Sequence, residues 1–160
     1  MNRDIVKYPN PLLKKRSEEV KEISEDVKNL IKDMEEAMVK NNGIGLAAPQ
    51  VGESKRIIII QDGQEIKVFV NPVIIKKSRD KEIMEEGCLS LPNVYFKIKR
   101  SKEIEVESLN EKRERLKIRA KGKPARIIQH EVDHLDGILF INRLGFWQKL
   151  KNRKKLNGLN

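Results

Sequence analysis

A short segment near the C-terminus contains both histidines of the chain, His130 and His134, four residues apart. On a helix with 3.6 residues per turn, this spacing places the two imidazoles on one face, where they can bind one cation. Glu131 follows the first histidine and completes the pattern H-E-x-x-H. In that pattern two imidazoles bind a divalent metal and the glutamate transfers protons for a metal-activated water. The segment therefore predicts hydrolytic metal chemistry.

Short motifs also match by chance, and two histidines at helical spacing can be ordinary surface residues. The residues around this motif favour the metal site. Apolar side chains flank it on both sides: Ile127, Ile128, Leu135, Ile138, Leu139 and Phe140. We therefore expect a buried helix, and buried imidazoles need partners.

A catalytic site of this kind needs a third protein ligand and one open position. No histidine, glutamate or aspartate follows Asp136, so the third ligand must lie upstream. Cys88, the single cysteine, is the strongest candidate, because a thiolate binds late first-row metals well. A lone thiol excludes an intramolecular disulfide and is typical of a reducing cytosol, where it can also be buried filler or a nucleophile.

The elements that position these residues follow from hydrophobic periodicity. Ser24 suits a helix N-cap, and apolar residues recur at helical spacing until residues 41–43 supply a stop signal. Strands are predicted over residues 56–62, over 66–70 and 73–75 with a break at 71–72, over 94–100, and around Ile104 and Leu116. The expected fold is α+β, with antiparallel sheets packed around a central metal-binding helix, an N-terminal helix and a C-terminal helix.

The composition indicates a single globular domain. A chain of 160 residues encloses one core, and we expect residues 1–160 to form one catalytic metallohydrolase domain. The N-terminus lacks the apolar stretch of a signal peptide, and the longest aliphatic run, residues 57–60, is too short to span a bilayer. These features favour a cytoplasmic protein.

The net charge of +10 is concentrated after Asp136, where basic residues occur without acidic ones. We expect a basic C-terminal helix over about residues 143–156. Such a helix is either simply solvated or binds a polyanion, which could be nucleic acid or an anionic membrane surface.

Residues 43–50, with the sequence GIGLAAPQ, combine two glycines with two alanines. Little side-chain bulk allows a ligand or another backbone to approach closely, although a tightly packed loop explains the composition equally well. The third glycine of a dinucleotide fingerprint is missing. Gln50 carries an amide that can donate to an oxyanion.

Three segments together resemble the peptide deformylase family: residues 43–50, residues 86–90 and residues 129–137. They occur complete and in the order of the family, and the resemblance extends along nearly the whole chain. It implies that the enzyme removes the formyl group from N-formylmethionyl nascent peptides and releases formate. It also implies that Cys88, His130 and His134 bind one divalent metal, Fe(II) first and Zn, Ni or Co as alternatives, and that Glu131 is the general acid and base.

The same resemblance assigns the remaining site residues. The Gln50 amide and the Leu89 backbone NH would stabilise the oxyanion. The peptide would lie as an added strand against Gly45. Its methionine side chain would enter an apolar pocket lined by Ile44 and Ile127, together with the ring of the first histidine. The family also suggests that the basic C-terminal segment contacts the ribosome, and we expect a monomer with no membrane partner.

Three carboxylates near the ligands have expected supporting roles. Glu86 resembles a structural carboxylate that pairs with an arginine, and Arg100 is the candidate partner. Asp133 and Asp136 either orient an imidazole from behind or lie on the surface.

Two departures from the family concern the substrate pocket. Residues 121–124 read KGKP where many relatives carry apolar residues, so the pocket wall is expected to be more open or more basic. Tyr95 stands where some relatives have an arginine that contacts the substrate, so that contact is not expected in this chain.

Two other functions are compatible with parts of the sequence. A metalloprotease that cleaves peptide bonds would share the helix but use a different third ligand, so replacing Cys88 would leave its metal bound. A basic RNA-binding or ribosome-binding module with a structural metal would need a closed site with four ligands, whereas three good ligands are visible.

Overall fold

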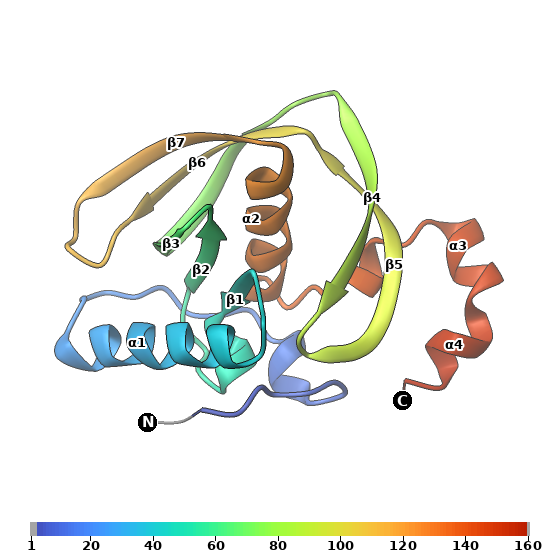
Figure 1. Ribbon diagram of the computed structural model, residues 1–160, viewed down its shortest axis with the longest axis horizontal. Helices are drawn as coiled ribbons and strands as arrows, with labels where there is room; N and C mark the ends of the chain where they lie inside the picture. Colours follow the sequence, from blue (N-terminus) through green and yellow to red (C-terminus); the bar gives the residue numbers. More distant parts are fainter. Residues whose placement is uncertain (1–2, 160) are drawn as a thin grey trace.

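The computed structural model of the protein describes residues 3–159, which fold around helix α2 (Gly122–Leu135) (Figure 1). The strands are β1 (Gly45–Ala47), β2 (Ile57–Asp62), β3 (Glu65–Lys77), β4 (Lys81–Cys88), β5 (Leu91–Ser101), β6 (Glu103–Leu109) and β7 (Arg115–Lys121). The other helices are α1 (Glu25–Lys40), α3 (Phe146–Lys151) and α4 (Arg153–Asn157), and there are 3-10 turns η1 (Pro11–Lys14), η2 (Ala48–Val51) and η3 (Phe140–Arg143).

The described strands form two antiparallel sheets. One sheet has the order β1-β2-β3-β6-β7, and the other is the β4-β5 hairpin. Helix α2 lies between them, with the larger sheet on one side and the hairpin on the other (Figure 1). The expected α+β fold, with antiparallel sheets around a central helix, is therefore confirmed.

Helix α1 forms where the sequence predicts it. The Ser24 hydroxyl caps it by accepting a hydrogen bond from the Val27 NH, and the helix ends at Lys40 with Asn41 as its C-cap. Its buried face, which includes Leu30, Met34 and Met38, packs against β1 and β2 in one hydrophobic cluster. This cluster supports the small-residue segment that follows the helix.

Helix α2 is buried along almost its whole length, from Ala125 to Leu135. Ile127, Ile128 and Leu135 pack in the cluster beneath the five-stranded sheet. On another side the Gln129 amide forms two hydrogen bonds with the Ser101 backbone, at 2.9 and 3.3 Å. Contacts with both sheets fix the rotation of the helix, and so determine where its histidines point.

Two expected boundaries were wrong. Strand β3 continues through the predicted break at residues 71–72, because the ladder tolerates an irregular register between Val70 and Val73. Asn71 takes a φ of 52° there, and its side chain bonds the backbone of Val20. The single C-terminal helix expected over about 143–156 is two short helices, α3 and α4. Asn152 ends α3 by donating from its side chain to the Gln148 carbonyl.

Among residues 3–159, no helix is both long and apolar enough to cross a membrane.

Candidate metal centre

Three potential ligand atoms converge at the end of α2. Cys88 ends strand β4, while His130 and His134 lie one turn apart on α2. One ligand atom from each of the three side chains lies within 4.8 Å of the others. The Cys88 Sγ is 3.2 Å from the His134 Nε2. The hairpin and the helix thus bring the predicted sulfur and the two predicted imidazoles together.

The chemistry of these donors fits a divalent cation. Burial alone would raise the pKa of the Cys88 thiol, but the neighbouring imidazoles lower it well below its usual value, which favours the metal-binding thiolate. The His130 Nδ1 lies 3.0 Å from Glu86, so its Nε2 is the nitrogen left for a metal. Burial would lower the His130 pKa, yet hydrogen bonds with Cys88 and Glu86 raise it to about 10. The negative charges of Cys88 and Glu86 that stabilise the protonated ring would also stabilise a cation bound at its Nε2.

Glu86 supports the His130 ring from behind. Its carboxylate accepts two hydrogen bonds from Arg100, at 2.7 and 3.0 Å, so the expected Glu86–Arg100 pair is present. Arg126 donates a further bond at 2.6 Å. Burial would raise the Glu86 pKa, but the bonds with His130 and Arg100 lower it to about 2. Glu86 is therefore ionised and holds the His130 ring in a fixed orientation.

Arg126 was not predicted to have a role, although its position gave a signal. It lies four residues before His130 and so occupies the same face of the helix.

Glu131 lies beside this cluster, and its carboxyl group is buried without a full set of hydrogen-bond partners among the described residues. Its side chain is buried, and its Oε2 has no hydrogen-bond partner among residues 3–159. A Cβ atom on Gly45 would lie 2.5 Å from the Glu131 Oε1, so the carboxyl rests directly on the glycine backbone. Burial raises the Glu131 pKa to about 7. A carboxyl with this pKa can both accept and return a proton near neutral pH.

The side-chain amide of Gln50 points toward the Cys88 Sγ. Its Nε2 donates to the Ser90 Oγ at 3.2 Å and lies 3.5 Å from the Cys88 Sγ. Its Oε1 accepts a bond from the Ala47 NH at 2.9 Å. Because the oxygen is held by the backbone, the NH2 group must face the site. Leu89 follows Cys88 in the turn between β4 and β5, and its carbonyl accepts a bond from Lys7.

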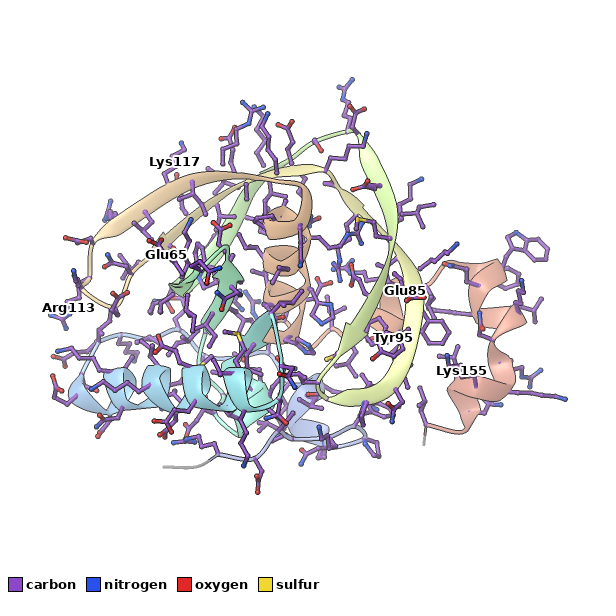
Figure 2. All side chains as sticks on the ribbon, viewed as in Figure 1. Glu65, Glu85, Tyr95, Arg113, Lys117 and Lys155 are labelled. Atoms are coloured by element: carbon purple, nitrogen blue, oxygen red, sulfur yellow. The ribbon has the colours of Figure 1, made fainter. Side chains whose placement is uncertain are left out.

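A cavity of about 600 Å³ opens in front of these groups. It is lined by the predicted site residues Ile44, Gly45, Gln50, Cys88, Leu89, Ile127, His130 and Glu131. Tyr95 and Lys123 also line it, and Figure 2 shows Tyr95 and Glu85 projecting from the β4-β5 hairpin. The cavity gives a substrate access to the proposed ligands, and Lys123 places a cation in its wall.

Neither predicted aspartate contacts an imidazole directly. Asp133 is buried and pairs with Arg100 and Arg143. Asp136 pairs with Arg56 at 2.8 Å. The Nδ1 of His134, the ligand nearest to both in sequence, finds no hydrogen-bond partner in the described part of the chain. The idea that these aspartates contact an imidazole was therefore wrong, whereas the alternative of a surface position holds for the exposed Asp136.

Comparison with known proteins gives a consistent result. A family model described as polypeptide deformylase matches residues 2–150. A peptide deformylase of Pseudothermotoga lettingae is 47% identical over 147 residues, which is 92% of this chain and 85% of the relative. The crystal structure of peptide deformylase from Thermotoga maritima superposes with a TM-score of 0.88 at 39% identity, over 91% of this chain and 99% of that one. A Plasmodium falciparum peptide deformylase in complex with an inhibitor superposes with a TM-score of 0.90 at 41% identity, over 97% of each chain.

Proposed function

Because this chain belongs to the peptide deformylase family, whose members remove the N-terminal formyl group from nascent proteins, we propose that the cavity beside Cys88 is where this hydrolysis takes place. The observation that supports the assignment most strongly is the convergence of one sulfur and two imidazoles beside Glu131, a buried carboxyl. We also propose that the protein is a monomer with one catalytic domain, because the three proposed ligands and Glu131 require no residue from a second copy.

Cys88, His130 and His134 are the proposed ligands of the metal on which the family depends. A metal ion bound there supplies Lewis acidity, which lowers the pKa of a water molecule and polarises the formyl oxygen. The donor set of one thiolate and two imidazoles suits Fe(II), and also Zn, Ni or Co. Fe(II) is our proposal for the native ion.

Glu131 is the proposed general acid and base. Its carboxylate accepts the proton of the attacking water, and the resulting acid returns a proton to the departing amine. The Gln50 amide and the Leu89 backbone NH donate to the oxyanion that develops on the formyl group. The Ala47 NH keeps the Gln50 amide turned toward this position.

The substrate peptide is proposed to bind along β1. This strand lies at the edge of the five-stranded sheet, so its outer edge can pair with an added strand. Gly45 lets that strand approach Glu131 closely. Ile44 and Ile127 line the cavity in front of the metal centre and offer an apolar surface to the methionine side chain.

The decisive experiment compares Glu131→Gln with the unmodified enzyme for formate release from a formyl-Met peptide. The variant keeps the size of the side chain but cannot accept a proton, so we expect the rate to fall by about 100-fold to 10,000-fold with metal content unchanged. Glu65→Gln on β3 is the matched control, because Glu65 is exposed and lies away from the cavity (Figure 2). Normal formate release by Glu131→Gln would refute the assignment.

Cys88→Ser separates deformylation from the protease alternative. A protease with a third ligand elsewhere would retain its metal, whereas we expect this variant to lose most of it, as measured by elemental analysis. The alternative of a structural metal requires a fourth side-chain ligand. The group of candidate ligands found among the described residues holds three, which supports a site that keeps one position open.

The C-terminal segment supports a role in recruitment to the ribosome. We define the C-terminal basic surface as the exposed residues Lys149, Lys151, Arg153, Lys154 and Lys155. Beside them, Phe146 and Trp147 are 73% and 77% exposed. Cations attract RNA phosphates, and aromatic rings stack on unpaired bases. Recruitment of this kind would take place where nascent chains are made, and agrees with a cytoplasmic location.

A further inference from the structure

A continuous set of charged side chains connects the proposed metal ligand His130 to Arg143, which lies beyond the end of the metal-binding helix. Glu86 contacts the His130 Nδ1 at 3.0 Å and the Arg100 Nε at 2.7 Å. The Arg100 Nη1 donates to the Asp133 Oδ2 at 2.8 Å. Arg143 then donates to both Asp133 oxygens, at 2.5 and 3.0 Å. Each contact joins groups of opposite charge or a carboxylate and an imidazole.

Four of these five side chains are buried, so their contacts are difficult to replace by water. Arg100 lies between two carboxylates, since its Nε and Nη2 hold Glu86 while its Nη1 holds Asp133. Asp133 is balanced by a second cation, Arg143. A buried carboxylate that loses one of its partners keeps an uncompensated negative charge, which attracts the cation that remains. Without Arg143, Asp133 would therefore draw Arg100 away from Glu86.

Turn η3 holds Arg143 in place. Phe140, at the start of this turn, is fully buried, and its ring lies 5.8 Å from the His130 ring, centroid to centroid. Leu139 and Leu144 pack in the same hydrophobic cluster on either side of the turn. Figure 1 shows the chain leave α2, pass the β4-β5 hairpin and enter α3. The turn therefore places the guanidinium of Arg143 against Asp133 on α2.

We propose that Arg143 is a positioning residue for the metal centre. By neutralising Asp133 it leaves Arg100 aligned with Glu86, and Glu86 fixes the orientation and tautomer of the His130 ring. The consequence is tighter metal binding. This inference rests on the proposed role of His130 as a metal ligand, and it assigns a function to Asp133 and Arg143 that neither residue performs by direct contact with the metal.

The test measures metal affinity in the full-length chain. Arg143→Gln, Arg143→Lys and the unmodified protein are titrated with Zn(II) in competition with a chromophoric chelator, and the visible absorption of the Co(II)-loaded proteins is recorded. Loss of a direct outer partner of a ligand weakens metal binding by about 10-fold to 100-fold. Arg143 acts on His130 through three further residues. We therefore expect Arg143→Gln to weaken metal binding by about tenfold, the lower limit of that range. Arg143→Lys should recover part of the affinity, and the Co(II) bands of Arg143→Gln should shift.

Arg119→Gln is the matched control. Arg119 is also an exposed arginine that makes two bonds to one carboxylate, Glu103, but it lies on β7 outside the set described above. The thermal midpoint of each metal-free protein shows whether the variants are folded. If Arg143→Gln does not fold, the same titration is made with Arg143→Lys, whose affinity must then lie below that of the unmodified protein.

Equal Zn(II) affinity and identical Co(II) bands for Arg143→Gln and Arg119→Gln would overturn the proposal. Weakened binding that is restricted to the Arg143 variants would support it. Cys88→Ser distinguishes a failure of the proposed function from a failure of the proposal for Arg143. If that variant binds Zn(II) as tightly as the unmodified protein, the ligand set itself is wrong, whatever Arg143 does.

Discussion

Gly45 shows how one missing side chain makes room for catalysis. Gly45 and Glu131 come from distant parts of the sequence, yet the Glu131 carboxyl rests on the glycine backbone. A Cβ atom at this position would also lie 2.7 Å from the Ile127 Cγ2. Real side chains do not approach so closely, so any larger residue would displace the proposed general base and the proposed wall of the methionine pocket together.

Gly45→Ala is therefore expected to lower kcat/KM for a formyl-Met peptide by about 10-fold to 100-fold, because small displacements of catalytic groups are costly. Steady-state kinetics measure the effect, and metal content should not change. Gly145→Ala is the control, because its Cβ would meet only a Gln148 side-chain atom, at 4.0 Å. Equal kcat/KM for the two variants would show that Gly45 does not constrain Glu131.

At the scale of elements, the position of the metal centre depends on how α2 packs. The helix carries two proposed ligands and the proposed general base on one side, and on another it buries Ile127, Ile128 and Leu135 in the cluster under the sheet. The Gln129 amide connects it to the strand junction at Ser101. The contacts that stabilise the fold therefore also determine the geometry of the site.

Ile128→Ala should lower the free energy of unfolding by about 2–5 kcal/mol, because Ile128 is fully buried and its loss leaves a cavity. Urea denaturation of the metal-free protein measures the change. Ile83→Ala on β4 is the control, since Ile83 is 61% exposed, and its effect should stay within about 0.5 kcal/mol. Similar losses at the two positions would contradict the packing described for α2.

At the scale of the whole molecule, charge is distributed unevenly. The C-terminal helices carry cations without acidic residues, while exposed cations elsewhere, such as Lys117 and Arg119, face glutamates across strands. Gln148 anchors α3 to the Lys97 carbonyl, and the Lys155 ammonium lies 4.7 Å from the centre of the Phe96 ring. The C-terminal basic surface is thus fixed to the hairpin that carries Cys88.

We expect the triple variant Lys151→Gln, Arg153→Gln and Lys154→Gln to bind ribosomes more weakly at low salt, with formate release unchanged. The dependence of affinity on salt should also become shallower, because fewer phosphate contacts release counterions. Co-sedimentation with ribosomes over a range of salt concentrations measures both quantities.

The control for that experiment replaces Lys76, Lys99 and Lys117 by glutamine, so that each variant has a net charge of +7 (10 minus 3). Equal ribosome binding by the two variants would assign the attraction to net charge and not to the C-terminal basic surface.

Much of this protein follows from local sequence. The spacing of His130, Glu131 and His134 predicted the helix and its chemistry, and the Ser24 cap with its periodic apolar residues predicted α1. These features depend on residues within a few turns of one another, so that periodicity and capping determine them. The sequence also predicted Cys88 as the upstream ligand, because the residues after Asp136 include no alternative.

Apart from the Glu86–Arg100 pair, which the family resemblance suggested, only the tertiary structure determined which charges meet. The bonds of Arg126 with Glu86 and of Arg143 with Asp133 join side chains from different elements, and nothing in their local sequence specifies a partner. Asp133 and Asp136 failed as imidazole partners for the same reason, because arginines from β5, from η3 and from just before β2 reach them first. Local patterns determine what an element is, whereas the packing of elements determines which buried charges can neutralise one another.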